Sequence, residues 1–120
     1  VIKKNNFNIK IFLINNGGYM SIRNSQKEFF QNNVHGTNYQ SGVYIPNIHD
    51  VSKFFNIKYY KCITESDISN NFKKEINYKR PAIFDCYSMK NQKIIPSIKS
   101  KVIKGKLIAQ PLENMYPYLD

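Results

Sequence analysis

The feature that most constrains the fold is an apolar run near the amino terminus that ends in a glycine-rich turn. Residues Ile9 to Ile14 read Ile-Lys-Ile-Phe-Leu-Ile, a pattern typical of a strand buried on both faces. The next four residues, Asn15-Asn16-Gly17-Gly18, are a strong turn signal. A helix is predicted to follow from about Tyr19 to Phe30, because its apolar residues fall on one side. This order of elements indicates an α/β fold.

The remainder of the chain alternates between helical and strand patterns. The expected elements are a long polar loop at Asn32–Tyr44, a helix that Asn47 caps with Asp50 at its third position, a strand at Ile57–Ile63, a helix that Thr64 or Ser66 caps and that runs to about Ile76, and a strand at Pro81–Tyr87. This order predicts a parallel sheet with helices on both faces. Residues 1–88 are expected to form the α/β core. The tail, 89–120, has three prolines and little periodicity, so we expect it to be irregular and to wrap over the body or reach a neighbour.

The chain has 120 residues and a formal net charge of +10, which comes almost entirely from lysine. Sixteen of its 18 basic residues are Lys, and Lys, Asn and Ile together occupy 49 positions. These residues share A/T-rich codons, so genome composition accounts for much of the basicity. A protein selected to bind phosphate or bases more often uses Arg, whose planar fork matches both groups. The composition therefore gives little support to a nucleic-acid partner.

Other properties of the sequence bear on location. No stretch approaches the roughly 20 apolar residues of a membrane span, and no signal-peptide core is present. Cys62 and Cys86 each lie in an apolar, strand-like run, which is typical of buried reduced thiols. We therefore expect a cytoplasmic protein without a membrane partner. The first residue is Val1, so either the start has been processed or the chain is a piece of a longer protein.

The turn formed by residues 15–18 is the strongest candidate for a binding site. Ligands of open α/β sheets bind beyond the carboxyl ends of the strands, and the turn lies at such an end. It leads into a helix N-terminus, where free N–H groups and the helix dipole favour an anion such as phosphate. An Asn side-chain oxygen and a backbone carbonyl could also ligate Mg²⁺, which prefers oxygen ligands. On spacing alone, a tight turn with capping residues is the alternative interpretation.

Other chemical signals are weaker. The sequence contains no nucleophile elbow, Walker A loop or zinc-protease motif. His49 is expected to be solvated in the first turn of a helix, and His35, in the polar loop, is the more interesting histidine. Asp85 lies inside an apolar strand, so it needs a partner if it is buried, and we expect an ion pair. Six lysines between 90 and 106 form the densest basic stretch, with no aromatic residue interleaved.

Residues 11–26, Ile-Phe-Leu-Ile-Asn-Asn-Gly-Gly-Tyr-Met-Ser-Ile-Arg-Asn-Ser-Gln, resemble the end of the thiamine diphosphate motif in the acetolactate synthase and pyruvate decarboxylase superfamily. The segments that look like the C-terminal part of acetolactate synthase-like large subunits are the loop Gly36-Thr37-Asn38-Tyr39, the helix around 51–55, the strand at 57–60, and the tail segments Ile95-Pro96-Ser97 and Pro111-Leu112-Glu113-Asn114-Met115. The resemblance covers essentially the whole chain. It implies the second half of a thiamine diphosphate-binding fold.

The resemblance also implies roles for single residues. In the family the second Asn of the pair gives its side-chain oxygen to Mg²⁺, and the residue two further on gives its carbonyl. These positions are Asn16 and Gly18 here, the implied metal ligands. The full set of implied cofactor-binding residues is Asn16, Gly17, Gly18, Tyr19, Met20, Ser21 and Ile22, of which the last two face the cofactor and substrate pocket. The same turn was the candidate anion and cation site on physical grounds.

The sequence departs from the family pattern in three respects. The Gly-Asp-Gly that opens the motif, with its second side-chain metal ligand, is absent and by family length would lie upstream of Val1. The Glu that activates the cofactor belongs in the family to another domain, so no catalytic residue is expected in this chain, which alone should be inactive. Ser25 stands where acetolactate synthases carry a Trp, and the chain has no Trp, so a related enzyme acting on another 2-oxo acid is an open alternative.

Two functional hypotheses follow from the sequence. The first is a fragment of a thiamine diphosphate- and Mg²⁺-dependent 2-oxo acid carboligase or decarboxylase, a transferase or lyase resembling the acetolactate synthase large subunit. Its partners would be the rest of the parent enzyme and a second subunit, in a dimer or tetramer, with FAD possible elsewhere in the parent. The second is a basic, non-enzymatic α/β module that binds nucleic acid or another polyanion with steeply salt-dependent affinity.

Overall fold

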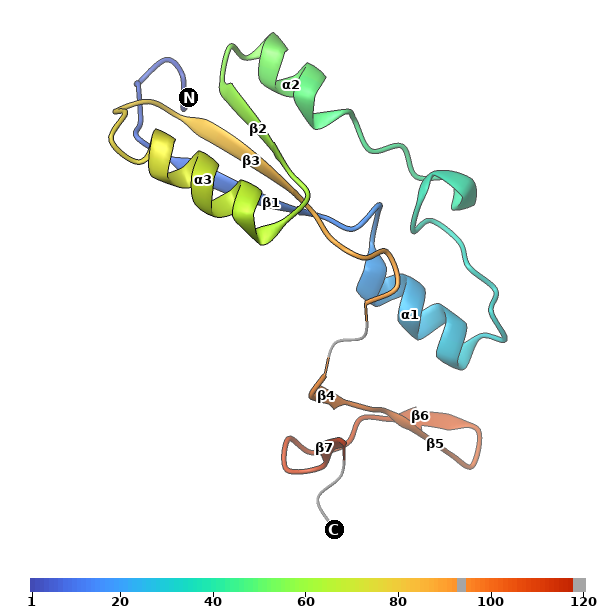
Figure 1. Ribbon diagram of the computed structural model, residues 1–120. Coiled ribbons are helices and arrows are strands. Elements are labelled where there is room, and N and C mark those ends of the chain that lie inside the picture. Colours follow the sequence, from blue (N-terminus) through green and yellow to red (C-terminus); the bar gives the residue numbers. More distant parts are fainter. Residues whose placement is uncertain (93–94, 118–120) are drawn as a thin grey trace.

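The computed structural model describes residues 1–92 and 95–117 and contains a parallel three-stranded sheet (Figure 1). The strands are β1 (Lys10–Asn15), β2 (Lys58–Cys62) and β3 (Ala82–Tyr87), in the order β1-β3-β2. The register pairs Asn15 with Tyr87 and Cys62 with Cys86, so the carboxyl ends of all three strands lie side by side at one end of the sheet. The predicted α/β class with a parallel sheet is confirmed.

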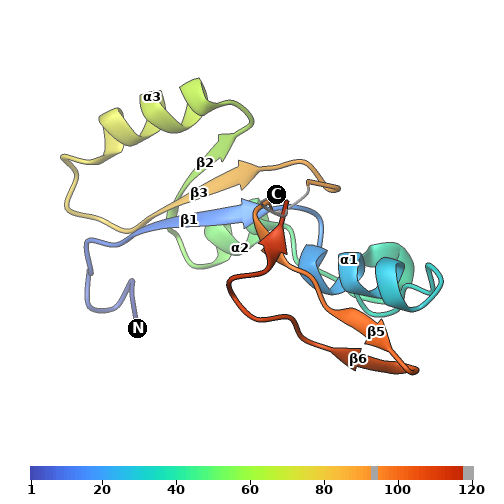
Figure 2. The same cartoon turned by 90° about the horizontal axis from the view of Figure 1, so that it is seen from below.

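Helices α2 (Ile48–Phe54) and α3 (Glu65–Glu75) lie on opposite faces of the sheet (Figure 2). Asn47 caps α2 by accepting hydrogen bonds from the backbone N–H groups of His49 and Asp50. Thr64 caps α3 in a reciprocal capping box with Asp67. Helix α1 (Met20–Phe29) lies instead beyond the carboxyl ends of β1 and β3, where it follows the glycine turn directly (Figures 1 and 2).

The hydrophobic core lies between the sheet and α3, around the fully buried ring of Phe84. This ring stacks on Phe12 and Tyr60, with centroids 4.7 and 5.1 Å away, and meets the edge of Phe72 at 6.1 Å. Alternation along β3 directs Phe84 to the α3 side, whereas Asp85, the next residue, faces the α2 side. The two cysteines are buried and free, as predicted from their apolar surroundings.

The prediction that the first strand is buried on both faces is wrong. Strand β1 lies at an edge of the described sheet, and its side chains Phe12 and Ile14 are 45% and 66% exposed. Strand β3 is the one buried on both faces, because it is the central strand of a sheet that has α3 over one face and α2 over the other. An apolar run shows that a segment can be buried, but it does not show where in the sheet the segment lies.

The segments between and after the core elements are mostly irregular. The expected polar loop contains one short 3₁₀ helix, η1 (Tyr39–Ser41). The tail forms two small antiparallel pairs, β4 (Ser97–Ile98) with β7 (Met115–Tyr116) and β5 (Lys101–Ile103) with β6 (Lys106–Ile108). An ion pair of 3.9 Å between Lys99 Nζ and Glu28 Oε1 joins the tail to α1. Lys93, one of the tail lysines, lies outside the described residues.

Within the described part of the chain, no helix has the length and apolar character that a membrane crossing requires.

Candidate functional site

The turn after β1 requires glycine at two positions. Gly17 and Gly18 have φ angles of +73° and +143°, which residues other than glycine rarely adopt. A Cβ at Gly18 would also collide with the carbonyl oxygen of Thr37. The same oxygen accepts a hydrogen bond of 2.7 Å from the backbone N–H of Tyr19. The backbone of the polar loop therefore lies directly against the backbone of the turn.

Local hydrogen bonds hold the polar loop in this position. Thr37 is fully buried, and its N–H donates to Ser41 Oγ at 2.9 Å. Asn38 and Ser41 form a capping box around η1. Gln26 of α1 binds the backbone of His35 twice, accepting from its N–H and donating to its carbonyl, each at 3.0 Å. His35 therefore contributes its backbone N–H and carbonyl to this contact, which the sequence did not predict. The spacing of Asn38 and Ser41 was the signal that could have revealed the loop structure.

The two asparagines of the turn have different environments. Asn15 uses both ends of its amide internally, because Nδ2 donates to Asp85 Oδ1 at 3.0 Å and Oδ1 accepts from the Gly17 N–H at 3.4 Å. Asn16 is half-buried, and no described residue forms a hydrogen bond with its side chain. The backbone carbonyl of Gly18 also accepts no hydrogen bond from any described residue. Asn16 rather than Asn15 therefore has an oxygen free to bind a ligand.

Asp85 has hydrogen-bond donors as partners instead of the expected cation. It is 1% exposed, and it accepts from Asn15 and, through Oδ2, from the hydroxyl of Tyr59 at 2.9 Å. No ion pair involving Asp85 is found within the described residues. Burial and the neighbouring Asp85 carboxylate raise the pKa of Tyr59 well above its usual range, so the phenol stays protonated and donates. The ion-pair expectation is therefore wrong.

Two cavities meet at Gly17. One of about 430 Å³ lies at the carboxyl ends of β1 and β3, lined by Asn15, Asp85 and Tyr87 and by residues 39–40 and 43–48. The other, of about 370 Å³, includes Arg23 and Lys27 of α1. Gly17 and Lys90 line both cavities.

The other predicted site residues are arranged less tightly. Ser21 lines a third cavity, between α1 and the tail. Five of the predicted cofactor-binding residues line none of these three cavities: Asn16, Gly18, Tyr19, Met20 and Ile22. The ring of Tyr19 and the side chain of Ile22 are about half exposed.

The N-terminus of α1 carries no competing anion. Tyr19 is the N-cap and makes no side-chain capping bond, and the first turn contains no acidic residue. The N–H groups of this turn are the orphan donors to which a phosphate binds in other proteins.

Arg23 is a structural residue that the sequence did not reveal. It is 5% exposed, and its Nη2 donates to the carbonyl of Lys90 at 2.6 Å. This bond joins α1 to the segment after β3 and closes the smaller cavity on one side. The sequence around Arg23 predicts only that it lies on a helix, and it gives no indication that its partner is Lys90, 67 positions away.

The donor set fits a hard cation in part. Within the described residues, no three His, Cys, Asp or Glu side chains lie close enough together to hold a metal ion. The free oxygens of Asn16 and Gly18 are of the type that Mg²⁺ prefers, and they are two of the about six ligands that it takes. The other ligands would have to come from the bound molecule, from water or from other residues.

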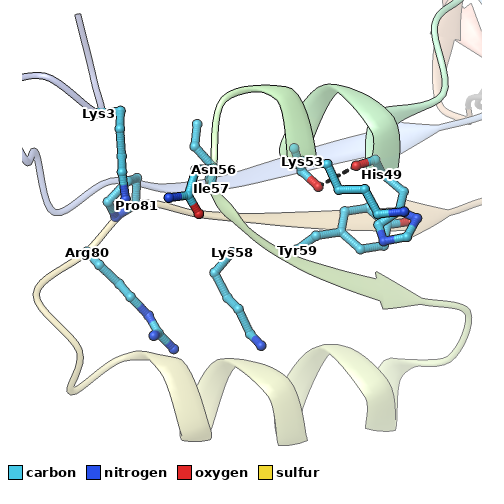
Figure 3. Close-up of a pocket in the computed structure, with 10 residues that line it drawn as sticks. Lys3, His49, Lys53, Asn56, Ile57, Lys58, Tyr59, Arg80 and Pro81 are labelled. Atoms are coloured by element: carbon cyan, nitrogen blue, oxygen red, sulfur yellow. Dashed lines mark hydrogen bonds between the residues drawn. The ribbon is translucent and has the colours of Figure 1, made fainter.

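A separate basic cavity of about 480 Å³ lies at the opposite, amino-terminal end of β2 and β3 (Figure 3). Four cationic residues line it, and none of the lining residues is acidic; the four are Lys3, Lys53, Lys58 and Arg80. The ring of His49 packs against that of Tyr59, with centroids 4.9 Å apart, so His49 is not merely solvated (Figure 3). Arg80 is already bound to Glu75, through bonds of 2.8 and 2.9 Å.

A family model describing the C-terminal TPP binding domain of thiamine pyrophosphate enzymes matches residues 1–86. The match includes the glycine turn, α1 to α3 and nearly all of β3, and it ends before the tail. The chain belongs to this family of thiamine diphosphate-binding domains. No curated protein matches the chain. The thiamine diphosphate resemblance is therefore confirmed, while its acetolactate synthase-like branch stays a prediction.

Proposed function

We propose that this chain anchors the diphosphate and Mg²⁺ of thiamine diphosphate in a 2-oxo acid carboligase or decarboxylase that resembles the acetolactate synthase large subunit. The observation that carries the proposal is the turn of residues 15–18. Its two glycines bring the backbone against Thr37, its second asparagine has a free side chain, and it opens an uncapped helix. These are the properties that an anion and a hard cation need from a protein.

Each residue of the site has a defined part in this proposal. Asn16 would give its side-chain oxygen, and Gly18 its carbonyl, to Mg²⁺. Gly17, Tyr19 and Met20 would lie near the diphosphate, and Ser21 and Ile22 near the reacting end of the cofactor. When bound, thiamine diphosphate would supply the electron sink for decarboxylation of the 2-oxo acid. The chain itself would bind and orient, because it contributes no catalytic residue to the proposal.

The proposed partners come from the same reasoning. The enzyme would act in the cytoplasm as a dimer or tetramer, with the proton-transfer chemistry supplied by another domain. It would bind neither nucleic acid nor membrane.

The test is the affinity of the full-length protein for thiamine diphosphate, measured by titration calorimetry with saturating Mg²⁺. Asn16→Ala should weaken binding by about tenfold or more, since it removes a metal ligand. Asn70→Ala is the matched control, because Asn70 is exposed on α3 and far from the turn in sequence. EDTA should abolish binding. An affinity for Asn16→Ala equal to that of the wild type would refute the site assignment.

One observation favours a second function, the binding of a polyanion. The cavity in Figure 3 gathers three lysines and one arginine with no acidic residue among its lining side chains. If it binds a polyanion, then Lys53→Ala and Lys58→Ala should each weaken the binding of single-stranded RNA at low salt and reduce its salt dependence. No binding by the wild type at low salt would eliminate this function.

A further inference from the structure

A chain of hydrogen bonds crosses all three strands on the α2 face of the sheet and ends at the glycine turn. It begins at the hydroxyl of Tyr59 on β2, passes through both oxygens of Asp85 on β3, and reaches the amide of Asn15 at the end of β1. From there Asn15 Oδ1 accepts the N–H of Gly17. The bonds measure 2.9, 3.0 and 3.4 Å in that order.

The chemistry of each link fixes the orientation of the next. The phenol of Tyr59 donates to Oδ2 of Asp85, and the Oδ1 atom that faces Asn15 is likewise an acceptor. The amide end of Asn15 that faces Asp85 must therefore be the donor Nδ2. Its oxygen is then turned toward Gly17, where it accepts the backbone N–H in an Asx turn. A rotated amide would set two acceptors against each other at one end and two donors at the other.

We propose that Asp85 is a positioning residue for cofactor binding, which fixes the Asn15 amide and thereby the backbone course through Gly17 that presents Asn16 and Gly18. The inference rests on the proposed function of this turn and adds to it a residue 70 positions away. Asp85 would touch neither the cofactor nor the metal in this role. Its full burial and the absence of a cationic partner among the described residues leave the orientation of its two donors as its evident purpose.

The decisive experiment is an exchange of the two side chains in the full-length protein. Asn15→Asp alone places two carboxylates face to face, so thiamine diphosphate affinity at saturating Mg²⁺ should fall by about tenfold or more. In the double variant N15D/D85N, the new amide can donate to the new carboxylate and still accept from Tyr59. The other oxygen of residue 15 can then accept from Gly17. Affinity should return to within about threefold of the wild type.

A pair of neighbouring tyrosines provides the control for a merely structural effect. Tyr59→Phe removes the first link and should weaken cofactor binding several-fold. Tyr60→Phe removes an equivalent bond of 2.7 Å to the buried carboxylate of Glu75 on the other face of the sheet. It should lower the melting temperature by a similar amount and leave cofactor affinity unchanged.

The possible outcomes separate this inference from the proposed function. Rescue by the exchange, with affinity lost in Tyr59→Phe but not in Tyr60→Phe, supports the positioning role. Normal affinity of Asn15→Asp, or a double variant as weak as the single one, overturns it while the proposed function stands. Failure of the wild type to bind thiamine diphosphate with Mg²⁺ overturns both. If Asn15→Asp does not fold, the two tyrosine variants decide: equal affinities refute the role.

Discussion

The contact between the glycine turn and the polar loop predicts a large effect of Gly18→Ala. The φ angle of +143° at Gly18 is one that alanine adopts only with strain, at a cost of about 1–3 kcal/mol. The added Cβ would collide with the Thr37 carbonyl oxygen and lie 3.1 Å from its carbon and 3.2 Å from Asn38 Cα. The hydrogen bond of 2.7 Å from Tyr19 prevents the loop from moving away freely. Overpacking against backbone adds about 1–3 kcal/mol, so the total is about 2–6 kcal/mol.

Gly36→Ala is the matched control for this prediction. Gly36 lies in the same loop with a φ angle of +63°, but no atom lies within 4 Å of the position of an added Cβ. Its substitution carries the backbone strain without the collision. Native-state hydrogen exchange in the full-length protein gives the free energy of opening for the loop amides in both variants. Gly18→Ala should lower that free energy by at least about 1 kcal/mol more than Gly36→Ala. Equal losses would refute the claim that the loop backbone forces glycine at the turn.

Three further predictions concern the core. Truncating the fully buried Phe84 to Ala should cost about 3–5 kcal/mol in urea unfolding, and a loss under 1 kcal/mol would contradict the packing described. The hydrogen bond from Arg80 lowers the pKa of Glu75, so the ionised carboxylate stabilises the fold. That stabilisation is fully present above the ordinary carboxyl pKa and is lost as the pH falls through the lowered one. Unfolding curves between pH 3 and 6 should therefore show a smaller loss of stability on acidification for Glu75→Gln than for the wild type. Burial raises the pKa of Cys86, and Cys62 is equally enclosed, so both thiols should react with a disulfide reagent only on unfolding; rapid labelling of the native protein would disprove this.

Local signals in the sequence were enough to predict most of the elements. The N-caps Asn47 and Thr64 act as expected because each satisfies N–H groups only two or three residues away. The apolar runs located all three strands to within one residue, because the pattern of apolar residues is likewise a local signal. The order of the strands depends on which pairs bury most area, which no single run encodes. The edge position of β1 was therefore missed.

The candidate site divides in the same way. The turn was visible because consecutive Asn and Gly residues have few other uses at a strand end. What holds the turn could not be read from the sequence, since Thr37, Asp85 and Lys90 all reach it from other segments of the chain. Asp85 was noticed as anomalous, but a buried carboxylate can be satisfied either by a cation or by neutral donors. Only the geometry distinguishes these two solutions.

The high positive charge of the chain does not come from arginine side chains that are free to bind a ligand. Arg23 gives its guanidinium to the carbonyl of Lys90, and Arg80 gives its guanidinium to Glu75. Both bidentate-capable side chains are thus engaged within the fold, and the charge of +10 rests on lysines, which are hydrated point charges on flexible stems. The turn at residues 15–18 would bind its anion through backbone N–H groups and a metal ion, neither of which needs a basic side chain. Removing surface lysines that line neither cavity at the turn should therefore change the isoelectric point without changing cofactor affinity, whereas a substitution at Gly18 should weaken that affinity.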